Sequence, residues 1–307
     1  ITDVVDIHMA YGPGSRRDTF PNADFRFLLR VATNIARMFA LMESQRIVIG
    51  DVNHGSIGVS SAATVTLFDI DSIQIEANGK VYRCRVGVAD FTPPELQGRD
   101  FKEIDQTAQH DRFRLAILLF KLLFLGRHPY VGVFSGRGEM TVERAIREHR
   151  FVYGSLAIQW EMRPPPGALT LNAHGDAIVQ LFERAFAGAA LHRGRPTPTE
   201  WIRAIGDLER DLVACGSSHH HARGKPCPWC AVEKHTRVPV FGVMQAITAT
   251  PMRHDPAGMT LAELMAAIES YPLPQGIAVP PPNLTDLPAP EAGASDLKWT
   301  LRALLAR

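Results

Sequence analysis

The sequence has almost no net charge: 33 Lys and Arg residues face 32 Asp and Glu residues, which leaves +1. Nucleic-acid binding usually shows as a clustered basic excess, and no basic stripe with interleaved aromatic residues is present, so we expect no nucleic-acid partner. The longest apolar run, 115–125, is interrupted by Lys121. A membrane-spanning helix needs about 20 apolar residues, so we expect no membrane association from this run. The acidic first residues lack the charged and apolar regions of a signal peptide.

Cysteine is scarce, with four residues in the chain, and three of them lie between Cys215 and Cys230. This clustering favours a metal site in a reducing compartment over a disulfide framework, so we expect a cytoplasmic protein. Cys227-Pro-Trp-Cys230 places two thiols at the spacing that suits one edge of a zinc tetrahedron, and Cys215 with one histidine of 219–221 completes it. Among the three histidines we favour His219. The alternative is a pair of structural cysteines in a loop with exposed histidines.

The remaining composition is that of a globular protein, with 46% hydrophobic and 21% charged residues. Apolar periodicity predicts helices at 21–42, 111–124, 141–149, 172–187 and 198–214, and the segment 111–124 is apolar on nearly every side, as in a fully buried helix. Short strands are expected at 46–49, 57–59, 65–68 and 81–86. The predicted fold is therefore mainly α with short β-hairpins. After about residue 236 the sequence predicts a proline-rich linker with short helices near 260–268 and 295–305.

A polar loop, 50–56, lies between apolar strands, and Asp69 follows Asp51 by eighteen residues. Taken alone, two such aspartates are usually turn formers or caps. Further along the chain come Phe91-Thr-Pro-Pro-Glu95, then Asp111 at the start of the apolar helix, and then an isolated Arg195.

This order resembles the protein kinases, whose signatures are a His-Arg-Asp loop with an Asn five residues after the Asp, then Asp-Phe-Gly, then Ala-Pro-Glu. In this sequence the three signatures correspond, in order, to Ile49-Gly50-Asp51, Asp69-Ile70-Asp71 and Pro93-Pro94-Glu95. The resemblance covers about 7–213 and implies a kinase C-lobe. It also implies that Asp111 opens the central buried helix of the lobe and that Glu95 and Arg195 form a buried ion pair.

The sequences of segments 48–53, 91–98 and 125–130 are similar to those of one bacterial group. This group consists of kinase-like proteins described as helix-hairpin-helix proteins. That group also tends to carry a Cys-Pro-Trp-Cys after the lobe. The resemblance implies a von Willebrand A protein and a PP2C-type phosphatase as partners. We accordingly divide the chain into a kinase-like C-lobe at 1–214, a zinc knuckle at 215–235, and a proline-rich linker with short helices at 236–307.

The resemblance implies a role for each matched residue. Asp51 would accept or orient the proton of the attacking hydroxyl, and Asp69 would hold a magnesium ion that bridges the phosphates of ATP. Ser56 stands where the family has its second magnesium ligand, an Asn, and it is a poorer ligand. Asn53 replaces the usual lysine, and Gly50 replaces the Arg that contacts a phosphorylated activation loop.

Only some twenty residues precede the first strong helix, and they lack the strand lysine of the ATP-binding lobe. Gly12-Pro-Gly-Ser-Arg-Arg17 lacks the flanking strands of a phosphate-binding loop, so we interpret it as an ordinary loop. The first residue is Ile, which fits a fragment or a processed chain. The sequence as given therefore favours a pseudokinase or regulatory scaffold. The alternative is an active Ser/Thr protein kinase once an N-lobe is present.

Overall fold

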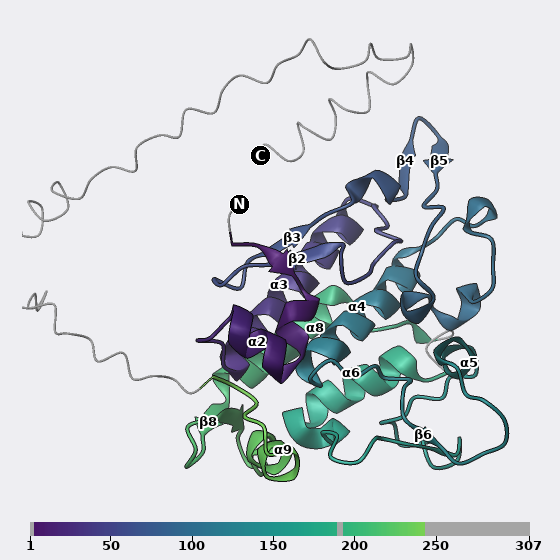
Figure 1. Cartoon of the computed structure of the whole chain (residues 1–307). Coiled ribbons are helices and arrows are strands. Elements are labelled where there is room, and N and C mark those ends of the chain that lie inside the picture. The colour runs from purple at the N-terminus through teal and green to yellow at the C-terminus, as the bar shows by residue number, and fades with distance from the viewer. Residues whose placement is uncertain (1–2, 189–192, 243–307) are drawn as a thin grey trace, which may run out of the picture. The chain divides into compact units, whose positions relative to one another are not determined.

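The computed structural model describes residues 3–188 and 193–242, which belong to one unit of the chain, Ile1–Gln245 (Figure 1). The predictions for the linker and for the helices near 260–268 and 295–305 lie outside these residues. The described helices are α1 (His8–Tyr11), α2 (Pro13–Thr19), α3 (Phe25–Ser44), α4 (Ala108–Leu123), α5 (Val142–Arg147), α6 (Asp176–Phe186), α8 (Pro198–Arg210) and α9 (Pro228–Thr236).

Helix α4 forms the centre of the core. From Phe113 to Leu123 its side chains are at most 9% exposed, including Arg114 and Lys121. Thr107 and His110 close a reciprocal capping box at its N-terminus, so the helix begins before Asp111 rather than at it. Helices α3 and α6 pack against α4 (Figure 1). The prediction of a helix buried on all sides is confirmed.

Helix α3 buries one face and exposes the other, as its spacing of apolar residues predicted. Asp24 caps it by accepting a hydrogen bond from the backbone N–H of Phe27, at 3.0 Å. The buried stripe runs from Phe25 to Phe39 and packs against α8 and α4. A leucine-to-alanine change on such a stripe typically costs about 2–5 kcal/mol.

The strands form small antiparallel sheets. The largest has the order β1 (Val5–Asp6), β2 (Ile57–Val59), β3 (Val65–Leu67), and the others are the pairs β4 (Ile75–Ala77) with β5 (Lys80–Tyr82), β6 (Val133–Phe134) with β7 (Met162–Arg163), and β8 (Leu212–Ala214) with β9 (His220–Ala222). Asn78 and Gly79 both have positive φ, which suits the tight turn between β4 and β5. The predicted combination of helices with short hairpins is thus confirmed for the described residues.

Four local predictions are wrong. The strand expected at 46–49 is only an isolated bridge at Val48, and the strand expected at 81–86 ends at Tyr82. Residues 12–17, interpreted as a loop, fall mostly in helix α2, where Pro13 takes the first helical position that a missing N–H favours. The helix expected over 198–214 ends at Arg210, because 212–214 pairs with β9 instead. Among the described residues, no helix combines the length and the hydropathy needed to cross a membrane.

Candidate active site and metal centre

The loop that carries Asp51 is fastened to the central helix by one carboxylate. Asp111 accepts hydrogen bonds from the backbone N–H groups of Ile49 and Gly50, at 2.6 and 3.1 Å. The same carboxylate pairs with Arg114 at 3.0 Å, and both side chains are almost fully buried. Hydrogen bonds to an ionised group are among the stronger ones in proteins. The backbone immediately before Asp51 therefore has little freedom.

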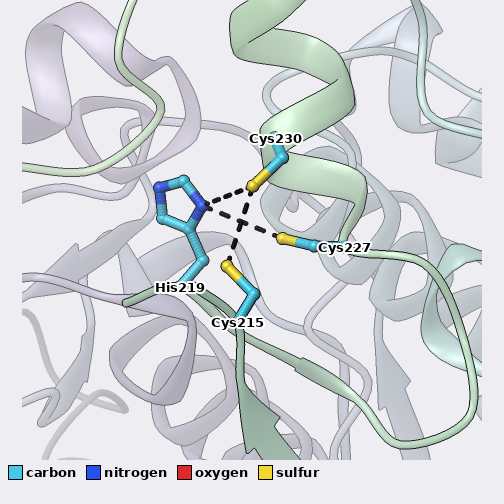
Figure 2. Close-up of side chains that lie close together, drawn as sticks. All are labelled: Cys215, His219, Cys227 and Cys230. Atoms are coloured by element: carbon cyan, nitrogen blue, oxygen red, sulfur yellow. Dashed lines mark hydrogen bonds between the residues drawn. The ribbon is translucent and has the colours of Figure 1, made fainter. Parts of the chain in front are cut away.

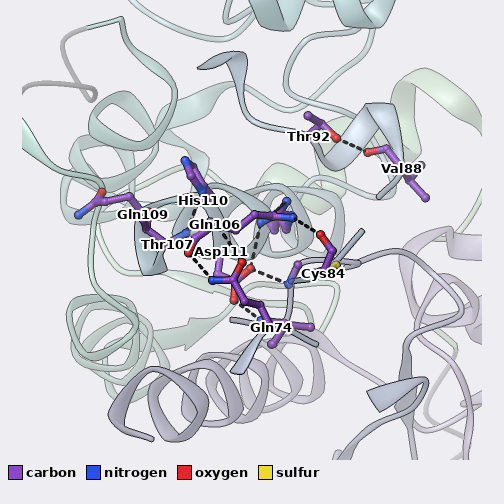
Figure 3. Close-up of polar contacts among 12 residues, drawn as sticks. Gln74, Cys84, Val88, Thr92, Gln106, Thr107, Gln109, His110 and Asp111 are labelled. Carbon is purple, nitrogen blue, oxygen red and sulfur yellow. Dashed lines mark hydrogen bonds and ion pairs between the residues drawn. The ribbon is translucent and has the colours of Figure 1, made fainter. Parts of the chain in front are cut away.

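Two buried glutamines, Gln74 and Gln106, connect the Asp111–Arg114 pair to the segments around Gln74 and Cys84. Gln74 donates to the carbonyl of Gln106 at 2.7 Å, and the N–H of Gln106 donates to the side chain of Gln74 at 2.8 Å. Arg114 donates to the side-chain oxygen of Gln106 at 2.6 Å, and the Gln106 amide reaches the carbonyl of Cys84 at 3.4 Å. Figure 3 shows Gln74, Gln106 and Cys84 gathered beside Asp111. Sequence reasoning missed both glutamines.

Gly50 allows the segment around Cys84 to pack directly on the loop. Gly50 has φ +74°, and a Cβ added there would lie 2.5 Å from Cys84 Sγ. Burial raises the pKa of the Cys84 thiol, which donates to the carbonyl of Val86 at 3.2 Å. Cys84 is thus a buried small residue. No arginine side chain fits at position 50 without moving this segment.

Asp51 and Asp69 lie on two neighbouring segments that are joined at both ends. The N–H of Phe68 donates to the carbonyl of Ser56 at 2.8 Å, and Val48 pairs with Gln74 in an antiparallel bridge. Asp51 is half-buried, and its Oδ1 has no hydrogen-bond partner among the described residues. Asp69 is exposed and has φ +51°, an uncommon backbone conformation for a residue other than glycine.

Ser56 uses its hydroxyl to close the loop. The hydroxyl accepts a hydrogen bond from the N–H of Asn53 at 2.9 Å and donates to the carbonyl of the same residue at 3.0 Å. The side chain is 1% exposed. The Asn53 carboxamide in turn accepts from the N–H of Gly55 at 2.8 Å. In this arrangement Ser56 shapes the loop, and its hydroxyl is buried.

Glu95 and Arg195 form a two-pronged ion pair, with N–O distances of 2.7 and 2.9 Å. Arg195 also donates to the carbonyl of Gln109 at 2.9 Å and lies over the ring of Phe113. Burial alone would raise the pKa of Glu95, but the hydrogen bonds and charge of Arg195 outweigh it and hold the pKa below its usual range. The pair ties the segment after Pro93 to the start of α4.

His54 was missed by sequence reasoning, although it lies in the same loop. Its ring contacts the rings of Tyr11 and Phe91 edge-on, with centroids 5.5 and 5.2 Å away. Burial lowers the pKa of His54 to about 4, and the nearby Lys121 adds to the effect. The loop is therefore packed on aromatic rings from α1 and from the segment before Glu95. Only the three-dimensional arrangement reveals this contact.

The three clustered cysteines and His219 converge on one point. Cys215 Sγ lies 3.7 Å from Cys230 Sγ, and His219 Nδ1 lies 3.5 Å from Cys230 Sγ and 3.8 Å from Cys227 Sγ (Figure 2). Two thiolates bound to one zinc ion at about 2.3 Å would lie about 3.8 Å apart at a tetrahedral angle. All four donor atoms lie within 4.8 Å of one another. This Cys₃His group could hold a zinc ion.

The neighbouring histidines point to other partners. His220 Nδ1 lies 3.0 Å from a carboxylate oxygen of Asp24, and His221 Nδ1 lies 3.1 Å from the carbonyl of Ala222. His219 Nε2, on the far side of the ring from the cysteines, lies 3.3 Å from Glu233 Oε1. A carboxylate at that nitrogen fixes the ring with Nδ1 free to bind a metal.

Trp229, between the two cysteines of the Cys-Pro-Trp-Cys motif, attaches this segment to the helices. Its side chain is 0% exposed and lies against Phe25 at a centroid distance of 4.8 Å and His174 at 5.6 Å. Its indole N–H donates to the carbonyl of His220 at 2.8 Å. Burial raises the pKa of the nearby Cys227 thiol to about 12, and zinc binding there would release the thiol proton.

No family model matches the chain. Among curated proteins it is similar to "Protein kinase YegI" of Escherichia coli strain K12, with 36% identity over 283 residues that cover 90% of this chain. The protein of the same name from Escherichia coli O157:H7 has the same identity over the same length. The chain spans 43% of the length of these relatives. It is thus similar over most of its own length to part of a bacterial protein kinase.

Proposed function

We propose that the described helical region is the C-lobe of a bacterial protein kinase, which transfers the γ-phosphate of ATP to a protein hydroxyl. The observation that carries the proposal is the fastening of the backbone at Ile49 and Gly50 by buried Asp111. A general base acts well only when its position is fixed relative to the proton it accepts. The similarity to a protein kinase over 90% of the chain supports the same conclusion.

Each residue would have a distinct role. Asp51 would accept or orient the proton of the attacking hydroxyl, whose oxygen forms a bond to the γ-phosphorus while the bond to the β–γ bridging oxygen breaks and ADP leaves. Asp69, exposed on the adjoining segment, would offer carboxylate oxygens to magnesium. Bound magnesium supplies neutralisation of the charge that develops on the phosphates. Glu95 and Arg195 would hold the segment beside the loop.

A second function, a scaffold that binds partners without turnover, is favoured by Ser56. Its hydroxyl is engaged in both directions with the backbone of Asn53 and its side chain is 1% exposed, so it is poorly placed to bind a second metal ion. A lobe that holds one magnesium ion instead of two would retain the shape of a kinase but lose part of the charge neutralisation.

Phosphate incorporation from labelled ATP and magnesium into a casein substrate separates the two functions. The assay uses the whole gene product that contains this chain. An active kinase should label the substrate, and Asp51→Asn should lower kcat at least about 100-fold, as expected for loss of a general base. Asp105→Asn, a change at an exposed carboxylate, is the matched control. Equal labelling by the wild type and Asp51→Asn would exclude the proposed base. Stabilisation by ATP and magnesium without labelling would favour the scaffold.

We also propose that the Cys₃His group binds one structural zinc ion through Cys215, His219, Cys227 and Cys230. The spacing of the donor atoms and the carboxylate on the far side of His219 support this. A closed four-ligand site supplies folding free energy rather than chemistry. Metal analysis should find about one zinc ion per chain. Cys227→Ser and Cys230→Ser should lose it, and Cys84→Ser, which changes the cysteine outside the cluster, should keep it. A folded wild-type chain free of zinc would refute the site.

The partners implied by the resemblance, a von Willebrand A protein and a PP2C-type phosphatase, remain predictions. The cytoplasmic location and the domain limits at 214/215 and 235/236 also remain predictions.

A further inference from the structure

The residues just after α9, Arg237–Gly242, which we call the strap, are connected to the metal centre by one carboxylate. Glu233 Oε1 lies 3.3 Å from His219 Nε2 and also accepts a hydrogen bond from the backbone N–H of Val240 at 2.8 Å. One oxygen atom therefore contacts both a candidate metal ligand and the strap. A shift of the His219 ring would change both contacts.

The other end of this connection is a buried arginine of α2. Arg16 donates to the carbonyl of Val240 at 2.7 Å and to the carbonyls of Ala10 and Tyr11 at 2.9 and 3.0 Å. Its guanidinium lies over the ring of Phe241, 4.9 Å from the centroid. The same Phe241 ring packs edge-on against Trp229, with centroids 5.2 Å apart. Arg16 thus joins the last residues of α1 to the strap.

Because Arg16 is buried, its guanidinium relies on contacts with the strap in place of water. The Arg16 side chain is 1% exposed, and burial lowers the pKa of its guanidinium to about 10. No carboxylate pairs with it among the described residues; carbonyl oxygens and a ring face replace part of its hydration, and its Nε has no hydrogen-bond partner there. Gly242 completes the close fit, because a Cβ there would lie 2.2 Å from the carbonyl oxygen of Pro21. The strap is held by few but specific contacts.

We propose that zinc binding at the Cys₃His group controls docking of the strap on α1 and α2, with Glu233 as the positioning residue and Arg16 as the docking point. This inference rests on the zinc proposal above. A bound metal fixes His219, and the ring orients Glu233, which presents its oxygen to Val240. The coupling is reciprocal by thermodynamic necessity, so a docked strap strengthens zinc binding.

The test compares amide hydrogen exchange and zinc affinity in the full chain, zinc-loaded and metal-depleted. We expect the amide of Val240 to be protected in the loaded protein and to lose at least about 10-fold of this protection on depletion. Glu233→Gln, which keeps an acceptor oxygen but removes the charge, should lower the same protection and weaken zinc binding by about 10- to 100-fold, the usual range for loss of a supporting carboxylate. Glu143→Gln, an identical change at an exposed carboxylate of α5, should alter neither quantity.

The reciprocal arm changes the docking point. Arg16→Gln, although Arg16 is not a ligand, should weaken zinc binding several-fold, and Arg99→Gln at an exposed position should not. If Arg16→Gln fails to fold, the strap protection and zinc affinity of Glu233→Gln test the inference instead. Equal strap protection with and without bound zinc would overturn this inference and leave the zinc site intact. A chain that binds no zinc would overturn both.

Discussion

The loop around Asp51 and the segment that carries the clustered cysteines are both polar, but they are fixed in different ways. The loop is attached to α4, whose apolar side chains make up much of the core. Hydrogen bonds of Asp111, Arg114 and Gln106 connect the loop to this rigid helix. The cysteine segment buries few large side chains, chiefly Trp229 and Val232. A polar loop can take its order from a neighbouring core, whereas a short polar segment needs cross-links of its own.

Loss of one metal ligand should give the largest difference in stability between the two regions. Cys227→Ser should unfold β8, β9 and α9 while the amides of α4 remain protected, because structural zinc contributes about 10–16 kcal/mol in small zinc-binding peptides. Hydrogen exchange resolved along the chain measures both regions at once. Simultaneous loss of protection in α4 would show that the two regions unfold together.

Loss of the buried carboxylate should damage the loop next most strongly. Asp111→Ala leaves Arg114 unpaired in the core and frees the N–H groups of Ile49 and Gly50, and it should lower the free energy of unfolding by about 3–5 kcal/mol. Asp105→Ala, which breaks the exposed pair with Arg83, should cost about 0.2–1 kcal/mol. Urea denaturation measures both values. Equal losses would contradict the anchoring role of Asp111.

The contact between the end of α4 and the cysteine segment should be sensitive to acid. His174 donates through Nε2 to the carbonyl of Leu123 at the end of α4 and lies near Trp229, and burial lowers its pKa to about 4. The folded state therefore binds fewer protons than the unfolded state, so stability falls as pH falls from about 6.5 to about 4.

This histidine alone would give a loss of up to about 3 kcal/mol. His174→Gln should flatten the decline, measured as the free energy of unfolding at several pH values. His8→Gln, at a half-exposed side chain, should leave the slope unchanged. An unaltered slope in His174→Gln would mean that His174 does not contribute.

The tight packing on the loop should give the smallest effect. Gly50→Ala and Gly98→Ala both place a side chain at φ +74°, but the methyl group of the first meets Cys84 and that of the second meets nothing within 4 Å. The backbone strain cancels between them, so Gly50→Ala should cost about 1–3 kcal/mol more, the usual penalty of overpacking. Thermal or urea unfolding of the pair measures the difference. Equal costs would show that Cys84 moves aside freely.

Much of the fold follows from local patterns. An unbroken apolar segment predicted α4, because a helix buried on all sides is apolar at nearly every position. Apolar residues spaced three and four apart predicted α3, because only one face of that helix is buried. The Cys₃His group was also predictable, since its four residues lie within sixteen positions of one another. The donor set of the group needed no long-range information.

Other features depend on partners distant in the sequence. Arg16 is buried because Val240, 224 residues later, supplies an acceptor, and no local signal announces this. Gln74 and Gln106 satisfy each other across 32 residues. Residues 212–214 have an acceptable helical pattern but pair with β9, so tertiary pairing overrides local propensity.

The burial of Trp229 against Phe25 and His174 bears on where the chain can be divided. Cutting at 214/215 would remove Trp229 from its packing against Phe25 of α3 and His174 before α6, and it would leave aromatic surface open to water on the larger piece. Such a piece would be prone to aggregate through that face. A shortened protein intended for crystallisation should therefore end after Gly242, where Pro21 and Arg16 still have their neighbours.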